Sequence, residues 1–328
     1  MGRLGIGPAE CIVLVRLWKN QLNIPPTRQL RRRRFVFWGA IGGLFSLAVL
    51  CVWLAWPPEA ESSHADFVQR FRGGALIIAG GGALPPIIRQ TFLDLAGGPV
   101  TAKLVVIPAF SLEPSETERL LQPWRTNNVR SVQILHTIDR LEADDASFAE
   151  ILDDATGVWL SGGDQGWLSK IYAGTLVEAK LKSLLQRGGV IGGSSAGAAA
   201  MTQIMIEQGQ EAPVEGVGFD LLPGAIVDQH FLRRSRLNRL MRLMESHPKM
   251  IAFGIDEGTA LVVHVASGKL GVLGNSYVVA YVPETKLGQP RFEVMKQSDQ
   301  IDIPGLVSGR VRISSPSDLD AILSDTSP

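Results

Sequence analysis

The residues Gly193-Ser194-Ser195-Ala196-Gly197 could supply the nucleophile of a hydrolase, because they fit the pattern G-x-S-x-G. They follow a short apolar run and precede an alanine-rich stretch. A serine at a tight turn from a strand into a helix needs very small neighbours, and the N–H groups of the helix N-terminus then favour a developing oxyanion. We predict Ser195 as the nucleophile. The alternative is a glycine-rich turn that only packs or binds an anion.

A serine hydroxyl is a weak nucleophile until a base takes its proton. Of the histidines beyond residue 72, His136 ends an expected strand, His247 lies at an expected helix end and His264 lies within an expected strand. His230 follows the apolar run Ala225–Val227, within Asp228-Gln229-His230-Phe231, and therefore lies at a strand end. We predict His230 as the base. The residues alone leave the orienting acid open between Asp256 and Glu257.

Three of the arginines that follow the predicted base, Arg234, Arg236 and Arg239, form a series. Arg236 and Arg239 are spaced i, i+3 and share one flank of an expected helix, whose core face carries Leu237, Leu240, Met241 and Met244. Arg234 lies at the expected helix start, and Ser235 is the expected N-cap. Because a guanidinium offers a planar fork, the three side chains predict a carboxylate-binding pocket. A solvated basic helix face is the alternative.

The elements that must position these residues alternate between short apolar runs and helical stretches. Strands are expected at Ala75–Ala79, Lys103–Ile107, Ser131–Leu135, Gly157–Leu160 and Gly189–Ile191, with helices at 85–95, 114–125, 145–152 and 175–187. Continuously apolar strands in a βαβα order indicate a parallel sheet with helices on both faces. Ligands bind beyond the carboxyl ends of such strands. Three glycine-rich strand ends meet there: Gly80–Gly82, Gly162-Gly163-Asp164-Gln165 and the serine turn.

A different pattern follows residue 250. The segments 251–255, 260–265, 269–273 and 277–282 predict consecutive strands, which we expect to form an antiparallel meander at one edge of the sheet.

The first 56 residues differ in composition from the rest. Phe35–Trp56 is a run of 22 uncharged residues directly after Arg31–Arg34, long enough at about 1.5 Å per residue to span a hydrocarbon core of about 30 Å. The arginines predict a cytoplasmic N-terminus, with everything after residue 57 on the outer side, periplasmic or at the cell surface. An uncleaved anchor is favoured, because the run exceeds the length of a typical signal-peptide core. Secretion after signal cleavage is the alternative.

Charge and cysteine content exclude several functions for the remainder. Residues 1–56 hold eight basic residues and one acid, so the other 24 basic and 31 acidic residues carry a net charge of −7. This balance argues against a nucleic-acid partner. Both cysteines, Cys11 and Cys51, precede residue 57, so the remainder has no disulfide, thiol nucleophile or thiolate metal site.

Together these motifs resemble the cyanophycinase family, serine peptidases related to aspartyl dipeptidase. The resemblance rests on segments that follow one another in order across about residues 73–282: Gly80–Gly82, Gly162–Gln165, Gly192–Ala198, Asp228–Phe231, the arginine series and Gly254–Glu257. It implies a flavodoxin-like α/β fold close to class I glutamine amidotransferases. The chain departs from the family at Ser194, where many members have threonine, and in its membrane segment.

The resemblance also implies roles for individual residues. Ser195 is the nucleophile, His230 the base and Glu257 the orienting acid, while the N–H groups of Ala196 and of the Gly81-Gly82 loop hold the oxyanion. Substrate would contact Gln165, Asp228, Gln229, Arg234, Arg236 and Arg239. Family members cut cyanophycin, a polyaspartate with arginine on each β-carboxyl, to β-Asp-Arg dipeptides.

The sequence therefore predicts a membrane-anchored serine hydrolase of cyanophycinase type, acting without a metal or other cofactor. Its expected parts are a basic tail (1–34), an anchor or signal (35–56), a linker (57–72), a catalytic α/β domain (73–312) and a flexible tail (313–328). Expected partners are a polyamide or peptide that carries carboxylate and guanidinium groups, and the membrane, with a homodimer as one option for the assembly. The alternatives are an aspartyl dipeptidase, an α/β-hydrolase esterase and a non-catalytic protein that binds acidic peptides.

Overall fold

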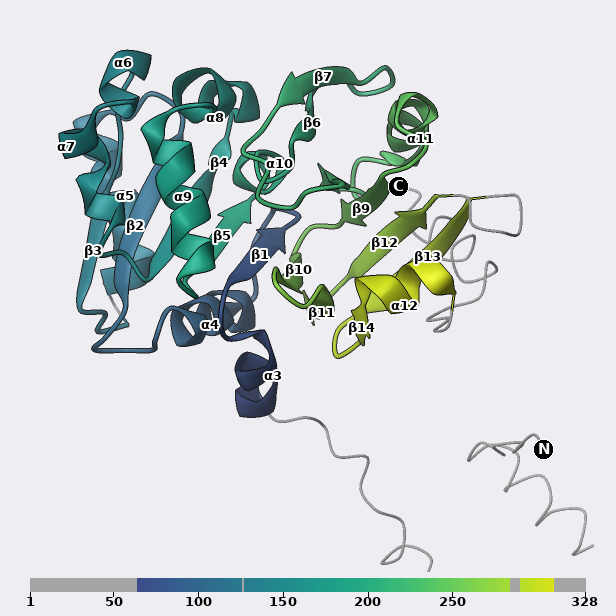
Figure 1. Cartoon of the computed structure of the whole chain (residues 1–328), viewed down its shortest axis with the longest axis horizontal. Coiled ribbons are helices and arrows are strands. Elements are labelled where there is room, and N and C mark those ends of the chain that lie inside the picture. The colour runs from purple at the N-terminus through teal and green to yellow at the C-terminus, as the bar shows by residue number, and fades with distance from the viewer. Residues whose placement is uncertain (1–63, 126, 284–289, 310–328) are drawn as a thin grey trace, which may run out of the picture. The chain divides into compact units, whose positions relative to one another are not determined.

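The computed structural model describes residues 64–125, 127–283 and 290–309, which belong to one compact unit. Its main feature is an eight-stranded sheet in the order β14-β11-β10-β1-β5-β4-β2-β3 (Figure 1). These strands are β1 (Ala75–Ala79), β2 (Lys103–Ala109), β3 (Ser131–Ile134), β4 (Gly157–Gly163), β5 (Val190–Ser194), β10 (Thr259–His264), β11 (Lys269–Gly274) and β14 (Gln300–Asp302). The strands β1 to β5 run parallel, and β10, β11 and β14 extend the sheet antiparallel beyond β1.

Helices cover both faces of this sheet, as the continuously apolar strands predicted. Leu76 and Ile78 of β1 face a core shared with α8 and α9, whereas Ile77 faces a core shared with α3, α4 and α5. The helices are α3 (His64–Phe71), α4 (Pro86–Leu95), α5 (Pro114–Arg125), α6 (Arg140–Ala143), α7 (Ala146–Ala149), α8 (Gln165–Tyr172), α9 (Leu176–Gln186), α10 (Ala196–Ala199), α11 (Leu237–Ser246) and α12 (Ile303–Ser308), with a 3₁₀ turn at Glu150–Leu152. The mixed α/β class with a parallel sheet is thereby confirmed.

The expected single meander after residue 250 is wrong. A second sheet, in the order β13-β12-β9-β8, contains β8 (Ala225–Gln229), β9 (Ile251–Ile255), β12 (Tyr277–Val282) and β13 (Arg291–Lys296). The chain therefore leaves the second sheet after β9, forms β10 and β11 in the first sheet, and returns at β12. All these strands are buried and apolar, so their pattern does not indicate which sheet each one joins.

Two local expectations also change. The linker predicted over 57–72 contains α3, because Phe67, Val68 and Phe71 pack into the core of the first sheet. Ser235 does not cap α11: the helix begins at Leu237 with Arg236 at its N-cap, and Ser235 has a left-handed φ of 50°. A hairpin of β6 (Ile204–Gln208) and β7 (Val214–Val217) was not predicted.

The expected membrane segment, 35–56, lies outside the described residues, as do the tails 1–34 and 313–328. Within the described part of the chain, none of the helices combines the length and the apolar character that crossing a bilayer requires.

Candidate active site

Ser195 lies at a strained turn between β5 and α10, at the carboxyl edge of the parallel strands. It has φ of 53° and ψ of −110°, which a non-glycine residue rarely adopts. Its N–H donates to the carbonyl of Ala79 at 3.0 Å, which fixes the turn to the end of β1. The side chain remains partly exposed, so the turn presents the hydroxyl above the sheet as the motif predicts.

The small residues around Ser195 are required by close backbone approach. A Cβ atom on Gly197 would lie 2.3 Å from the carbonyl oxygen of Leu160, and one on Gly193 would lie 2.7 Å from the backbone of Gly197. Contacts this short cannot be relieved by moving a flexible side chain, because the clashing atoms belong to the backbone. The glycines therefore allow α10 to start directly over the end of β5.

His230 follows β8 in the second sheet and reaches the serine across the junction of the two sheets. Its Nε2 atom lies 2.7 Å from Oγ of Ser195. The residue is buried, has φ of 50°, and donates its backbone N–H to the carbonyl of Gly80 at 2.8 Å. The predicted nucleophile and base are thus within hydrogen-bonding distance, although 35 residues separate them.

The two candidate acids, adjacent in the turn between β9 and β10, lie in different places. Glu257 Oε1 is 2.6 Å from Nδ1 of His230. Asp256 accepts from the N–H of Arg233 at 2.9 Å and from the hydroxyl of Ser276 at 2.8 Å, so it holds the neighbouring loops. With Glu257 accepting the Nδ1 proton, Nε2 is free to accept the proton of Ser195.

The glycine loop after β1 lies against both partners of the serine. A Cβ on Gly81 would lie 2.3 Å from Cε1 of His230, and one on Gly82 would lie 2.8 Å from Oε2 of Glu257. The carbonyl of Gly81 accepts from the N–H of Gly258 at 2.9 Å. Ala196, the first residue of α10, has an N–H without an acceptor inside its helix. The expected oxyanion donors, Ala196, Gly81 and Gly82, therefore border the site.

Burial lowers the pKa of His230, and the positive charges of Arg234 and Arg236 lower it further, against a hydrogen bond and a charge from Glu257 that raise it. His230 is therefore neutral near pH 7, the form that can accept a proton. Arg234 is exposed, and its backbone N–H donates to the carbonyl of His230.

We expect kcat/KM to fall as pH drops through a pKa below 6.5, because protonated His230 cannot act as a base. Replacing Arg234 by glutamine removes one of the charges that lower the pKa of His230. The acid limb of the pH profile of kcat/KM should therefore move to higher pH. Kinetics with an uncharged activated ester, at low and at high salt, would measure the shift, which salt should reduce because Arg234 is exposed. If the midpoint of the acid limb in Arg234→Gln is unchanged or lower, then Arg234 does not lower the pKa of His230.

The arginine series does not form the open pocket that its spacing predicted. Asp228 is fully buried in β8 and accepts hydrogen bonds from both Arg236 and Arg239, which are themselves buried. Arg236 also donates to the carbonyl of Gln229 at 2.5 Å, and Arg239 to that of Gly209 at 2.5 Å. Burial lowers the pKa of Arg236 to about 10, so it remains charged at neutral pH. The carboxylate that these two arginines bind belongs to the chain itself.

Loss of Asp228 should therefore destabilise the fold. Asp228→Ala leaves two guanidinium groups buried without their partner, and we expect the free energy of unfolding to fall by about 3–5 kcal/mol. The exposed pair of Glu116 and Arg119 is the control, because Glu116→Ala should cost about 0–1 kcal/mol. Urea denaturation would compare the two variants. Equal losses in the free energy of unfolding would mean that the buried cluster stabilises the fold no more than a surface ion pair does.

The predicted amide residues flank this cluster. Gln165 donates to the carbonyls of Ile206 and Glu207 at 3.1 and 2.7 Å, which ties α8 to the hairpin β6–β7. Gln229 is buried, and its side-chain oxygen has no partner among the described residues. The contacts with Gly209, Arg233 and Ser276 were not predicted, because they join separate loops and follow no local spacing.

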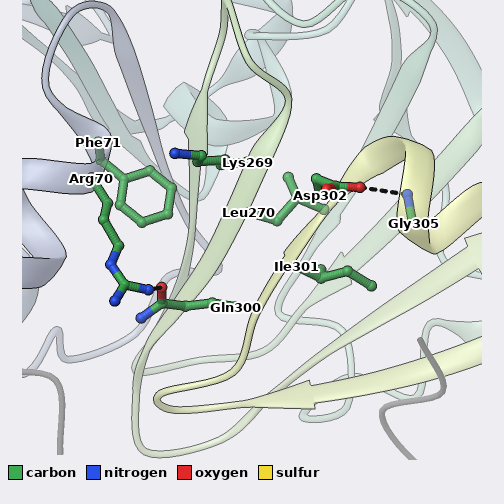
Figure 2. A pocket seen from close by; sticks show the side chains of 8 residues that line it. All are labelled: Arg70, Phe71, Lys269, Leu270, Gln300, Ile301, Asp302 and Gly305. Atoms are coloured by element: carbon green, nitrogen blue, oxygen red, sulfur yellow. Dashed lines mark hydrogen bonds between the residues drawn. The ribbon is translucent and has the colours of Figure 1, made fainter. Parts of the chain in front are cut away.

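A separate cavity has a volume of about 600 Å³. Figure 2 shows the residues that line it. It is lined by residues of α3, β11, β14 and α12, and Arg70 donates to the side chain of Gln300 at 2.6 Å on its rim. Phe71 precedes β1, whereas Ser195 follows β5, which pairs with β1 in parallel. This cavity is therefore no part of the site around Ser195.

A serine, a histidine and a carboxylate joined by two short hydrogen bonds on an α/β sheet define the class of serine hydrolases. Comparison with known proteins identifies the family. Residues 76–270 match the model of peptidase family S51. The chain belongs to this family and is a serine peptidase of the cyanophycinase type.

Individual relatives agree with this assignment. The chain is 38% identical over 239 residues to a cyanophycinase of Synechococcus elongatus, which covers 69% of this chain and 72% of that protein. It is 33% identical over 207 residues to a cyanophycinase of Geminocystis herdmanii, with 59% and 75% covered. The crystal structure of a peptidase from an acI-B1 actinobacterium superposes with a TM-score of 0.56 at 22% identity, covering 71% of this chain and 98% of that one, which supports the fold.

Proposed function

We propose that this peptidase hydrolyses cyanophycin, releasing β-Asp-Arg dipeptides through an acyl-enzyme on Ser195. The observation that carries the proposal is the hydrogen-bonded series Ser195, His230 and Glu257, in a chain that covers most of the length of a cyanophycinase at 38% identity. Geometry supports a hydrolase, and the relatives point to the substrate.

In the proposed reaction His230 Nε2 takes the proton of Ser195 while Oγ attacks the scissile carbonyl carbon. The N–H groups of Ala196 and of the Gly81-Gly82 loop would hold the oxyanion. When the tetrahedral intermediate collapses, the C–N bond breaks and His230 returns the proton to the leaving amine. Water then attacks the ester carbonyl carbon while His230 takes its proton. When this second intermediate collapses, the bond from carbon to Oγ breaks, His230 returns the proton to Oγ of Ser195, and the acid is released.

We assign substrate contacts to Gln165, Gln229 and Arg234. The buried cluster of Asp228, Arg236 and Arg239 would instead stabilise the fold behind the site. Gln229 offers a buried amide oxygen without a partner among the described residues, which could accept a hydrogen bond from a guanidinium of the substrate. Arg234 is exposed next to His230 and is suited to a carboxylate.

The test is to incubate the full chain with cyanophycin, with α-aspartyl dipeptides and with an activated ester, and to identify the products by mass spectrometry. Release of β-Asp-Arg from the polymer supports the proposal. Cleavage confined to α-aspartyl dipeptides would favour an aspartyl dipeptidase, and cleavage confined to the ester would favour an esterase. Binding of acidic peptides without turnover would indicate a non-catalytic protein.

We also propose that residues 35–56 anchor the chain in a membrane with its catalytic domain outside the cytoplasm. The support is the sequence itself: 22 uncharged residues after four arginines. Protease added to intact cells should then digest the domain, and protection until lysis would reverse the orientation. A mature chain that begins near residue 57–65 would indicate a cleaved signal, and sedimentation of the purified chain would test for a homodimer.

A further inference from the structure

Arg89 on α4 carries a guanidinium that is not committed to the fold. The residue is half-buried, and within the described part of the chain it makes neither a hydrogen bond nor an ion pair. It differs in this from Arg236 and Arg239, whose guanidinium groups are bound to Asp228. A guanidinium without a partner in the fold is free to bind an anionic ligand.

The side chain of Arg89 lines a small cavity that shares the wall residue Gly162 with the surroundings of the nucleophile. The cavity measures about 160 Å³ and lies between α4, α5 and the end of β4. Gly162 forms part of its wall, and a Cβ atom on Gly162 would lie 3.6 Å from Cβ of Ser195. A substrate chain held at Ser195 that continues past Gly162 would reach this cavity and Arg89.

The chemistry of the walls favours an anion. Trp124, Trp159 and Leu84 supply apolar surface, and no residue that lines the cavity is acidic. Arg119 also borders it but is exposed and paired with Glu116 at 2.7 Å, which leaves Arg89 as the cation available to a ligand in this cavity. Apolar walls reduce screening by water, so a carboxylate would bind a guanidinium more strongly here than at an open surface.

The cavity also limits the size of what can bind. A second cavity of about 510 Å³ continues between α4 and α5, and Arg89 and Pro123 line both. Arg89 thus borders both the narrow cavity and the wider one. A short acidic group fits the narrow part, and a longer chain could leave through the wider part.

We propose that Arg89 binds the free carboxylate of the substrate residue that flanks the scissile bond. The inference rests on the proposed function, because each arginine branch of cyanophycin carries a free α-carboxylate. Arg89 would then be a specificity-determining residue that selects branched polyaspartate over uncharged peptides, without taking part in bond cleavage.

The experiment compares β-aspartyl-arginine with its C-terminal amide as ligands of the full chain carrying Ser195→Ala. Binding is followed by calorimetry and by tryptophan fluorescence, to which Trp124 and Trp159 in the cavity wall contribute. We expect Arg89→Gln to weaken binding of the free acid by about 10- to 100-fold and to leave binding of the amide unchanged, as for a lost hydrogen bond between charged groups. Arg89→Lys should recover part of the loss, since it keeps the charge without the fork.

Arg119→Gln is the matched control, because it borders the same cavity and should change the affinity for the free acid less than about 2-fold, as expected for an exposed paired charge. Equal losses for acid and amide, no loss in Arg89→Gln, or no binding of either ligand would overturn the role of Arg89. These outcomes are separate from the proposed function, which fails if the active chain releases no β-Asp-Arg from cyanophycin. Circular dichroism of each variant would show that it is folded.

Discussion

Replacing Ser195 by alanine is expected to lower kcat/KM on cyanophycin by about 10⁴-fold or more, as in other serine triads. The hydroxyl is held 2.7 Å from the base at a turn that the surrounding glycines preserve, so the substitution removes the nucleophile without changing the site around it. Product release measured by mass spectrometry, with the fold checked by circular dichroism, would test the expectation.

The neighbouring residue gives a matched control. Ser194 is the last residue of β5 and pairs with Ala79 in the sheet, whereas the hydrogen bond to His230 is made by Ser195. Ser194→Ala should therefore retain most of the activity, and a serine-directed covalent inhibitor should label Ser195. If both substitutions reduce kcat/KM alike, or if the label is found on Ser194, the nucleophile is misassigned.

The elements that carry the site could be predicted because their signals are local. Apolar runs such as Ala75–Ala79 are buried along their whole length, a pattern that is typical of a parallel sheet covered on both faces. The turn at Ser195 needs Gly193 and Gly197 for steric reasons that hold in any such turn. Likewise, the residue that follows a strand lies at the edge of the sheet, as His230 does after β8.

What could not be predicted depends on contacts between distant segments. The i, i+3 spacing correctly places Arg236 and Arg239 on one side of the chain, but it does not indicate what lies opposite. Packing of that side on β8 brings Asp228 against them, so charges expected to bind substrate stabilise the interior. The same limit applies to β10, because its apolar pattern fits either sheet. Only its pairing with β1 shows that it joins the first sheet.

The choice between Asp256 and Glu257 shows this limit most sharply. The two carboxylates are adjacent, so any spacing that suits one suits the other. The structure separates them through the turn from β9 to β10, where Asp256 lies among backbone and hydroxyl donors and Glu257 lies against the imidazole. Their substitution should therefore have different consequences.

Glu257→Gln is expected to lower kcat by about 10³- to 10⁴-fold, close to the loss seen when the acid of a serine triad becomes an amide. The amide keeps the size of the side chain, but its N–H₂ group can turn toward Nδ1 and favour the tautomer that cannot accept the proton of Ser195. Asp256→Asn, the control, should retain most of the catalytic rate. Its expected effect is a loss of stability, because Asp256 holds the N–H of Arg233 and the hydroxyl of Ser276.

A pH titration would separate orientation of His230 from a general structural effect of Glu257. Burial lowers the pKa of His230, and the hydrogen bond that its Nδ1 donates to Glu257 opposes that change. Removing the negative charge should therefore lower the pKa further and move the acid limb to lower pH, opposite in sign to the shift expected for Arg234→Gln. An NMR titration of His230, or the pH dependence of the residual rate, would measure this change in pKa. If Asp256→Asn moves the limb and Glu257→Gln does not, then Asp256 is the acid that acts on the histidine.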